Sequence, residues 1–305
     1  MTKAISILLL VPLLAVMLLM ACSSDEQTKG VSVVASFYPM YEVAQQVGGD
    51  RATVRNLVPA GTEPHEFEPT PQETAAVLKA KIVVYDGAGF EAWMDRLLPD
   101  LKKKGVTLVE ATSVTTLLEM TDEEDPDRKV PDPHVWTDPA LMQKVVTLVR
   151  DAYIKADPEG RATYEANAAA YDARLAALDQ KFQQELKGYT RRTFVTTHAA
   201  FSYLAKRHNL EQIAIAGLSP IDEPSAQQLA AISRMAKEQG IKYIFFETLV
   251  SPRLAETIAR EVGATTEVLN PAEGLTPEEI RAGKDYISVM EQNLANLKKA
   301  LEASK

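Results

Sequence analysis

The chain has 305 residues, which is more than one average hydrophobic core needs, so two domains are expected. Hydrophobic residues make up 46% and charged residues 25% of the chain, proportions that fit a globular protein and exclude a disordered or fibrous one. The formal net charge of −9 argues against a nucleic-acid partner, because binding to phosphates depends on an excess of Lys and Arg.

The first residues have the pattern of a secretory signal. Lys3 is followed by a largely apolar run over residues 4–21, which ends in a small residue. We therefore expect residues 1–21 to be a signal peptide that takes no part in the fold. The protein is then expected outside the cytoplasm.

The signal is followed by a sequence that resembles a bacterial lipobox, Leu-Met-Ala-Cys at residues 19–22. Cleavage before Cys22 would leave a thiol for lipidation, and residues 22–30 would form a polar tether to the cell membrane. A signal anchor that stays in the membrane is the weaker alternative, because polar residues begin at once with Ser23. Since Cys22 is the single cysteine, no internal disulfide is expected.

The chain then alternates strands with helices. Apolar runs predict strands over residues 31–37, 53–59, 81–86 and 106–110. Apolar spacings of three and four, with Pro in two of the first turns, predict helices over residues 38–48, 70–79 and 90–103. This alternation implies a parallel sheet wrapped by helices, and residues 31–156 form the expected N-terminal α/β lobe.

The end of this lobe contains two further features. Residues 121–129 are acidic and lack apolar periodicity, so a solvated surface loop is expected rather than an arm that collects cations for a site. A Pro-rich stretch at residues 131–139 then leads into a helix that Thr137 is expected to cap.

The longest helical pattern covers residues 157–188, with Asp157 as its expected N-cap before Pro158. Apolar side chains recur along it at spacings of three and four, so one stripe is expected to be buried. At about 1.5 Å per residue the helix would span about 45 Å, which is longer than a small domain is wide. We therefore expect it to link two domains.

Strand and helix alternation starts again after this helix. Strands are predicted over residues 192–197, 212–216, 241–246 and 265–269, and a final amphipathic helix over residues 277–301. Residues 189–305 are thus an expected C-terminal lobe. The predicted fold class is α/β, with two similar lobes, each a mostly parallel four-stranded sheet with flanking helices, joined by one long helix.

Three of the four histidines lie after predicted strands. His65 follows the second strand, His134 lies in the crossover that leaves the N-terminal lobe's last strand, and His198 follows the first strand of the C-terminal lobe. Ligands of open α/β sheets bind at the carboxyl ends of strands, and neutral imidazole nitrogen is a ligand that zinc accepts. The sequence therefore predicts a divalent-metal site between the lobes.

Spacing alone does not decide the fourth ligand. A carboxylate fourth ligand would be Glu247, after the apolar third strand of the C-terminal lobe, or Glu273, after the last strand. His208 lies among charges at a predicted helix end, where histidines are common, and is expected on the surface.

Several short motifs resemble those of a known family. They are Glu-Pro-His-Glu-Phe-Glu-Pro at residues 63–69, Pro-His-Val-Trp at 133–136, Thr-His-Ala-Ala-Phe at 197–201, Ser219-Pro220 with Glu-Pro-Ser at 223–225, and Glu247 with Ser251-Pro252. In this order, from Cys22 to the C-terminus, the chain resembles the metal-binding lipoproteins of ABC importers for zinc and manganese. These are the cluster A-I solute-binding proteins of ZnuA and AdcA type.

The resemblance implies metal ligands at His65, His134 and His198, with a fourth in the loop after the last strand. In this chain that loop contains Glu273, where manganese-type members carry Asp, so Glu247 becomes a residue that supports the site. Manganese members often place Glu where His198 stands, and an additional nitrogen donor favours zinc over manganese. The acidic loop departs from the pattern, because many zinc members carry histidines there.

The implied function is capture of Zn²⁺ outside the cytoplasmic membrane and delivery to an ABC permease, whose ATPase is a separate chain. Zinc is then a transported ligand, and the protein is a lipid-anchored monomer without catalytic activity. The long linking helix predicts small lobe motion. Because an imidazole must be neutral to bind metal, affinity is expected to fall as pH drops through about 6.

Three other functions are alternatives to zinc capture for import. A manganese-importer binding protein and a surface adhesin with structural zinc both agree with the motifs. A zinc hydrolase does not, because the chain has no His-Glu-x-x-His helix and Glu273 would fill the position that a reacting water needs.

Overall fold

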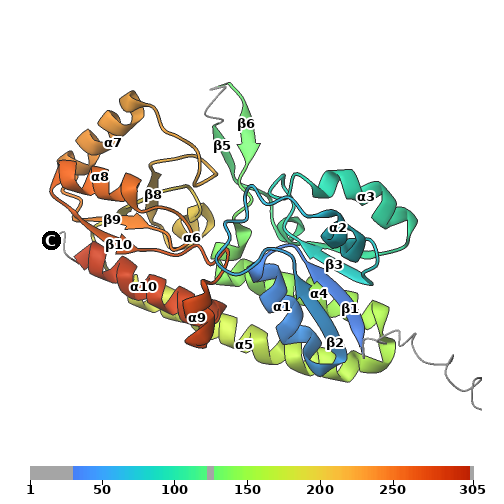
Figure 1. The fold of residues 1–305 in the computed structure, drawn as a ribbon. Coiled ribbons are helices and arrows are strands. Elements are labelled where there is room, and N and C mark those ends of the chain that lie inside the picture. Colours follow the sequence, from blue (N-terminus) through green and yellow to red (C-terminus); the bar gives the residue numbers. More distant parts are fainter. Residues whose placement is uncertain (1–29, 122–126, 303–305) are drawn as a thin grey trace, which may run out of the picture.

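The structure is a computed structural model that describes residues 30–121 and 127–302. Two α/β lobes lie side by side along one long helix (Figure 1). The expected signal peptide, the lipidated Cys22 and all but the last residue of the expected tether lie outside the described residues, as does the middle of the acidic segment. Among the helices described, none is both long enough and apolar enough to cross a membrane.

The N-terminal lobe is built on a parallel sheet with the strand order β2-β1-β3-β4. Strand β3 is buried and apolar throughout, as a central strand covered on both faces requires. The elements are β1 (Val31–Ala35), α1 (Tyr38–Gly48), β2 (Ala52–Asn56), α2 (Pro71–Val77), β3 (Ile82–Tyr85), α3 (Met94–Lys103), β4 (Thr107–Glu110) and α4 (Pro139–Ala156).

The C-terminal lobe repeats this plan with the strand order β10-β9-β7-β8, again with every strand parallel. Its strands are β7 (Thr193–Thr196), β8 (Glu211–Ala214), β9 (Tyr243–Phe246) and β10 (Thr265–Val268). Its helices are α6 (Ser202–Arg207), α7 (Ala226–Glu238), α8 (Arg253–Val262), α9 (Pro277–Arg281) and α10 (Tyr286–Glu302). The predicted fold class is confirmed.

Helix α5 (Arg161–Glu185) packs against both lobes. It contacts α1 and α4 in the N-terminal lobe and α10 in the C-terminal lobe, and it runs beneath both sheets in Figure 1. One continuous cluster of buried apolar side chains extends from Val84 through Tyr171 to Phe245. The lobes therefore share a core, which makes independent movement of either lobe costly.

The start of the long helix differs from the prediction. A 3₁₀ turn (Pro158–Gly160) precedes α5, and Asp157 does not cap the helix with its side chain. Its carboxylate instead accepts hydrogen bonds from Arg51 Nη2 at 2.7 Å and from the Tyr164 hydroxyl at 2.8 Å. A tertiary contact with Arg51, in the turn that follows α1, therefore takes the place of a side-chain cap.

The cap of α4 also differs from the prediction. Asp138, and not Thr137, accepts the hydrogen bond from the Ala140 N–H at 2.9 Å. Thr137 is buried, and its hydroxyl lies within hydrogen-bond distance of the backbone oxygens of His134 and Ala200. Helix α4 therefore begins one residue later than expected.

Three further helix and strand boundaries differ from the prediction. The expected final helix is broken into α9 and α10, since Gly283 has a left-handed φ of 71° that a helix cannot continue through. Helix α3 begins at Met94 because the Glu91 carboxylate accepts the N–H groups of Asp86 and Gly87 and folds the preceding residues into a loop. The acidic segment is framed by a hairpin of β5 (Glu119–Thr121) and β6 (Lys129–Pro131), where only a loop was expected.

Candidate metal centre

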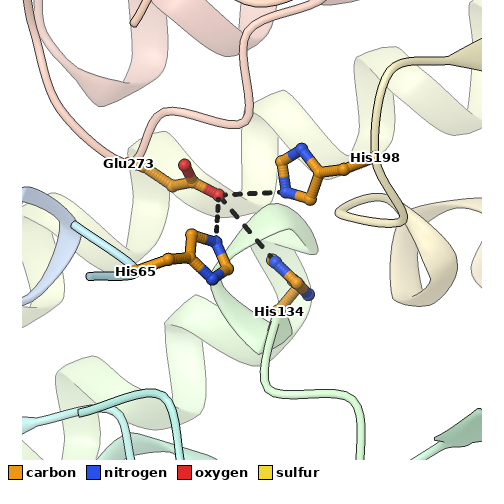
Figure 2. Close-up of side chains that lie close together, drawn as sticks. All are labelled: His65, His134, His198 and Glu273. Carbon is orange, nitrogen blue, oxygen red and sulfur yellow. Dashed lines mark hydrogen bonds and ion pairs between the residues drawn. The ribbon is translucent and has the colours of Figure 1, made fainter. Parts of the chain in front are cut away.

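Four side chains from four separate loops converge between the lobes (Figure 2). His65 comes from the loop after β2, His134 from the connection into α4, His198 from the residues after β7, and Glu273 from the loop after β10. One ligand atom from each lies within 4.8 Å of the ligand atoms of the others. The structure thus brings together all four residues that the resemblance selected.

The imidazole nitrogens face one carboxylate oxygen. The distances from Glu273 Oε1 are 3.4 Å to His65 Nε2, 3.8 Å to His134 Nε2 and 3.4 Å to His198 Nε2. Among the described residues, the Nε2 atoms of His134 and His198 have no hydrogen-bond partner although both are buried. Buried nitrogens without partners are costly, and a cation between them and the carboxylate would satisfy them.

Burial differs between the four side chains. His134 and His198 are fully buried and Glu273 is 2% exposed, whereas the His65 side chain is 10% exposed. The centre is therefore dry, which strengthens its electrostatic interactions. Solvent reaches it from the His65 side.

Carboxylates hold two of the imidazole rings from behind. Nδ1 of His134 lies 2.8 Å from Asp132 Oδ1, and Nδ1 of His198 lies 2.7 Å from Glu247 Oε1. Each pairing holds a proton on Nδ1 and directs Nε2 toward the centre, the arrangement that is usual around metal-bound histidine. Glu247 thus has the supporting position that the resemblance implied, but sequence reasoning missed Asp132.

Both carboxylates are themselves fixed. Asp132 Oδ1 also accepts the N–H of His134 at 3.0 Å, and the backbone oxygen of Asp132 accepts the Tyr203 hydroxyl at 2.7 Å. Glu247 accepts a hydrogen bond from the hydroxyl of Thr197. The sequence signal for Asp132 was its position two residues before His134.

The loop around His65 is shaped by local contacts. Glu63 Oε1 accepts the N–H of His65 at 2.9 Å, and the ring of Phe90 packs edge-on to the imidazole with centroids 4.7 Å apart. Glu66 and Glu68 are exposed, and Glu68 pairs with Arg96 at 2.5 Å. The three glutamates of this motif therefore serve the loop and the surface.

The loop that carries Glu273 has a support that sequence reasoning also missed. Asn293 of α10 is buried, donates from Nδ2 to the Asn270 backbone oxygen at 2.6 Å, and accepts the Asn270 N–H at 2.8 Å. Asn270 Oδ1 in turn accepts the N–H of Ala272 at 2.8 Å. Ala272 has an unfavourable φ of 59°, so these bonds hold a strained backbone directly before Glu273.

Hydrogen bonds also cross between the lobes around the centre. The Trp136 Nε1–H donates to the Pro271 backbone oxygen at 2.8 Å, and the Tyr286 hydroxyl donates to the Trp136 oxygen at 2.6 Å. The Thr137 hydroxyl lies 2.9 Å from the His134 oxygen and 3.0 Å from that of Ala200. These contacts join the lobes without the help of a metal.

The site is electrostatically coupled. Burial lowers the pKa of His134, although Asp132 partly opposes this. Burial also disfavours the protonated form of His198, but Glu247 and Glu273 outweigh it and raise the pKa of His198 to about 10. Burial would raise the pKa of Glu273, yet His65 and His198 hold it well below its usual value. Glu273 is therefore an anion, as a metal ligand must be.

His208 does not lie on the surface as predicted. It is buried, its ring stacks on Phe182 of α5 with centroids 5.5 Å apart, and burial lowers its pKa to about 4. The position of His208 at a helix end among charged residues predicted exposure, but Phe182 of α5 covers its ring. His208 is not part of the four-residue group.

Comparison with known proteins gives a family and several relatives. The family model for ZnuA, the periplasmic zinc-uptake complex component A, matches residues 33–300. The zinc-binding lipoprotein AdcA of Streptococcus pneumoniae serotype 4 is 43% identical over 309 residues, covering 98% of this chain and 61% of AdcA. The chain thus spans about three-fifths of the length of that curated relative.

Solved structures agree with the fold. The Zn(II)-bound ZnuA-like domain of S. pneumoniae AdcA has a TM-score of 0.78 and 43% identity, covering 90% of this chain and 99% of that domain. The laminin binding protein Lmb of Streptococcus agalactiae, described as bifunctional with adhesin and metal transporting activity, has a TM-score of 0.79 and 36% identity, covering 89% of this chain and 100% of that one.

Proposed function

Because the chain belongs to the ZnuA family of zinc-uptake components, we propose that it captures Zn²⁺ outside the cytoplasmic membrane and delivers it to an ABC importer. The observation that carries this proposal is the convergence of three imidazoles and one ionised carboxylate in a buried centre between the lobes. Such a group has no evident structural use without a cation, since it leaves buried nitrogens without partners.

We assign the four ligands to His65, His134, His198 and Glu273. Three nitrogen donors and one oxygen donor suit the tetrahedral preference and borderline softness of zinc, whereas manganese prefers sites richer in oxygen. The Zn(II)-bound state of the related AdcA domain supports this choice of metal. A manganese-importer role is therefore not favoured.

The same ligand set argues against catalysis. A catalytic zinc site keeps one position open for water or substrate, and Glu273 would occupy that position here. His134, His198 and Glu273 are also buried. Zinc is thus cargo in our proposal, and the protein is not an enzyme.

Partners and location follow from the proposed uptake role. The protein would act as a monomer with a membrane permease and a separate ATPase chain. Residues 1–21 would be removed as a signal peptide, Cys22 would carry the lipid, and residues 22–30 would tether the protein to the cell membrane. The proposed division of the rest is an N-terminal lobe over 31–156, a linking helix over 157–188 and a C-terminal lobe over 189–305.

Release of the metal would involve small displacements. The shared core and the hydrogen bonds from Trp136 to Pro271 and from Thr137 to Ala200 oppose a wide separation of the lobes. A shift of the partly exposed His65 loop would be sufficient to open the centre to water. We therefore propose local opening rather than hinge closure.

The experiment that tests uptake is growth in zinc-depleted medium after deletion of the gene. Complementation with the full chain should restore growth, and complementation with His198→Ala should not, while manganese depletion should leave the deletion strain unaffected. The Lmb relative suggests adhesion as a second role. Normal growth of the deletion strain at low zinc, together with loss of surface attachment, would replace the uptake proposal by the adhesin one.

A further inference from the structure

Five lysines collect at the amino-terminal edge of the N-terminal sheet. Two lie between α2 and β3, two lie in the last turn of α3 and one directly follows it; we call them the lysine edge, which consists of Lys79, Lys81, Lys102, Lys103 and Lys104. All five are exposed, and none forms an ion pair with any residue that the structure describes. Five adjacent positive charges without acidic partners repel one another and favour an anionic partner.

The two groups of lysines form one continuous surface. Strands β3 and β4 are neighbours, with Ile82 opposite Thr107, and the Thr107 N–H donates to the Lys81 backbone oxygen at 3.1 Å. Lys104 Nζ lies 3.4 Å from the backbone oxygen of Leu78. The turn before β3 and the turn before β4 are therefore in contact, although they are far apart in sequence.

The lysine edge adjoins the point where the described chain begins. The Lys81 N–H donates to the Ser32 backbone oxygen at 2.9 Å. A surface cavity of about 620 Å³ beside it is lined by Gly30, Ser32 and Lys81, and also by Asp50 and by the ion pair of Arg51 with Asp157. The segment that precedes Gly30, which we propose to be a tether to the membrane, therefore leaves the fold next to the lysine edge.

The charge of this edge is opposite to that of the whole chain, which has a net charge of −9. Lysines near helix C-termini often compensate the helix dipole, and Lys102 and Lys103 in the last turn of α3 have that position. Lys104 is the C-cap residue of the same helix, but Lys81 lies directly before β3, so dipole compensation does not account for Lys81.

We propose that the lysine edge lies on the anionic phospholipid headgroups of the membrane to which the chain is tethered. This inference relies on the proposed tether but not on the identity of the metal. Clustered lysines next to a membrane anchor bind anionic headgroups through their summed charge, an interaction that salt screens. The metal centre lies at the opposite, carboxyl ends of the strands, so this contact directs the centre toward the solvent, where free zinc is encountered.

Lysine footprinting tests the contact on the full chain. The protein is reconstituted in lipid nanodiscs of phosphatidylcholine alone or with about 30% phosphatidylglycerol, and an amine-reactive ester modifies the lysines for mass spectrometry. With phosphatidylglycerol the lysine edge should react about threefold more slowly, and about 0.5 M NaCl should remove this protection. The internal controls are exposed lysines of the C-terminal half without described ion pairs, namely Lys187, Lys206, Lys237 and Lys242, whose rates should not change.

A charge-reversal variant tests whether the charges of the lysine edge cause the protection. K102E/K103E/K104E should abolish the protection of Lys79 and Lys81, whereas the matched variant K187E/K206E/K237E should retain it. Equal modification rates in both kinds of nanodisc, or equal protection of both lobes, would overturn the proposal. Protection by inorganic phosphate alone would also overturn it, since the edge would then be a phosphate site. Zinc binding measured on the same samples shows separately whether the metal proposal has failed.

Discussion

The lobes each supply two proposed zinc ligands, but they hold them in different ways. In the C-terminal lobe, Glu247 orients His198, and Asn293 fixes the strained loop before Glu273. In the N-terminal lobe, His134 is held by Asp132, but His65 is partly exposed and its second ring nitrogen makes no hydrogen bond to any described residue. Three ligands are thus preorganised, and the fourth, His65, is the one that can move for metal entry and release.

Removal of single ligands gives the largest expected effects and tests this asymmetry directly. His198→Ala and Glu273→Ala should each lower zinc affinity by more than about 100-fold, because they break the buried, preorganised part of the centre. His65→Ala should lower it by only about tenfold, because water can replace a partly exposed ligand. Competition with a chromophoric chelator measures all three.

The matched control for these variants is Glu66→Ala, which removes an exposed carboxylate next to His65 and should leave affinity unchanged. Equal losses for His65→Ala and His198→Ala would remove the distinction between the two lobes. An undisturbed affinity in Glu273→Ala would show that the fourth ligand has been wrongly assigned.

Loss of the carboxylates behind the rings should have the next largest effect. Asp132→Asn and Glu247→Gln each keep the shape of the side chain but weaken the hold on Nδ1, and zinc affinity should fall by about 10-fold to 100-fold. Isothermal titration calorimetry on the metal-free variants measures this. A change of less than about twofold in both would mean that the imidazole orientation is set by packing alone.

Asn293→Ala should have a smaller effect on affinity, about tenfold, because the Glu273 loop would lose both of its bonds to α10. A faster zinc dissociation rate, measured by stopped-flow chelation, is the expected signature of a loosened ligand. Glu291→Ala removes an exposed carboxylate of the same helix, which pairs with Lys181 of α5, and is the control. A lower melting temperature with an unchanged dissociation rate would assign Asn293 to stability only.

Much of the site was predictable because local rules place it. Apolar runs located the strands, and the positions after them contain His65, His134 and His198, since parallel strands end at one edge of a sheet. The choice of Glu273 over Glu247 depended on the family resemblance, because spacing alone left both open. In the sequence alone, nothing distinguishes a metal-binding glutamate from another glutamate that follows a strand.

The contacts that were missed are tertiary. Asn293 acts on a loop 23 residues earlier, and nothing in an amphipathic helix pattern marks one buried asparagine as a support. His208 is buried because Phe182 of α5 stacks on it, a contact that charged neighbours in the sequence concealed. The break at Gly283 was overlooked because the apolar spacing continues across it.

The last expected effect is on stability and not on zinc affinity, and it concerns His208, which lies in the shared core outside the centre. Its folded-state pKa of about 4 lies below the ordinary value of 6.5, so the unfolded chain binds a proton first as pH falls. The contribution of His208 to the free energy of unfolding is therefore constant above about pH 6.5 and declines from there to about pH 4, by at most about 1.4 kcal/mol per pH unit.

Urea denaturation of the metal-free protein between about pH 6.5 and about pH 4 measures this decline in the free energy of unfolding. His208→Phe keeps a ring against Phe182 without a titrating group, so its stability should depend less on pH than that of the natural chain. Parallel stability curves for the two proteins would contradict the buried, neutral state of His208.

The central claim is that one zinc ion is held between the lobes by three imidazoles and one carboxylate. Crystals of the purified protein, with anomalous scattering collected at the zinc and manganese absorption edges, test it most directly. We predict a single strong peak at the zinc edge, within bonding distance of His65, His134, His198 and Glu273, and no manganese signal. A manganese peak at that position, or zinc bound without Glu273, would contradict the account.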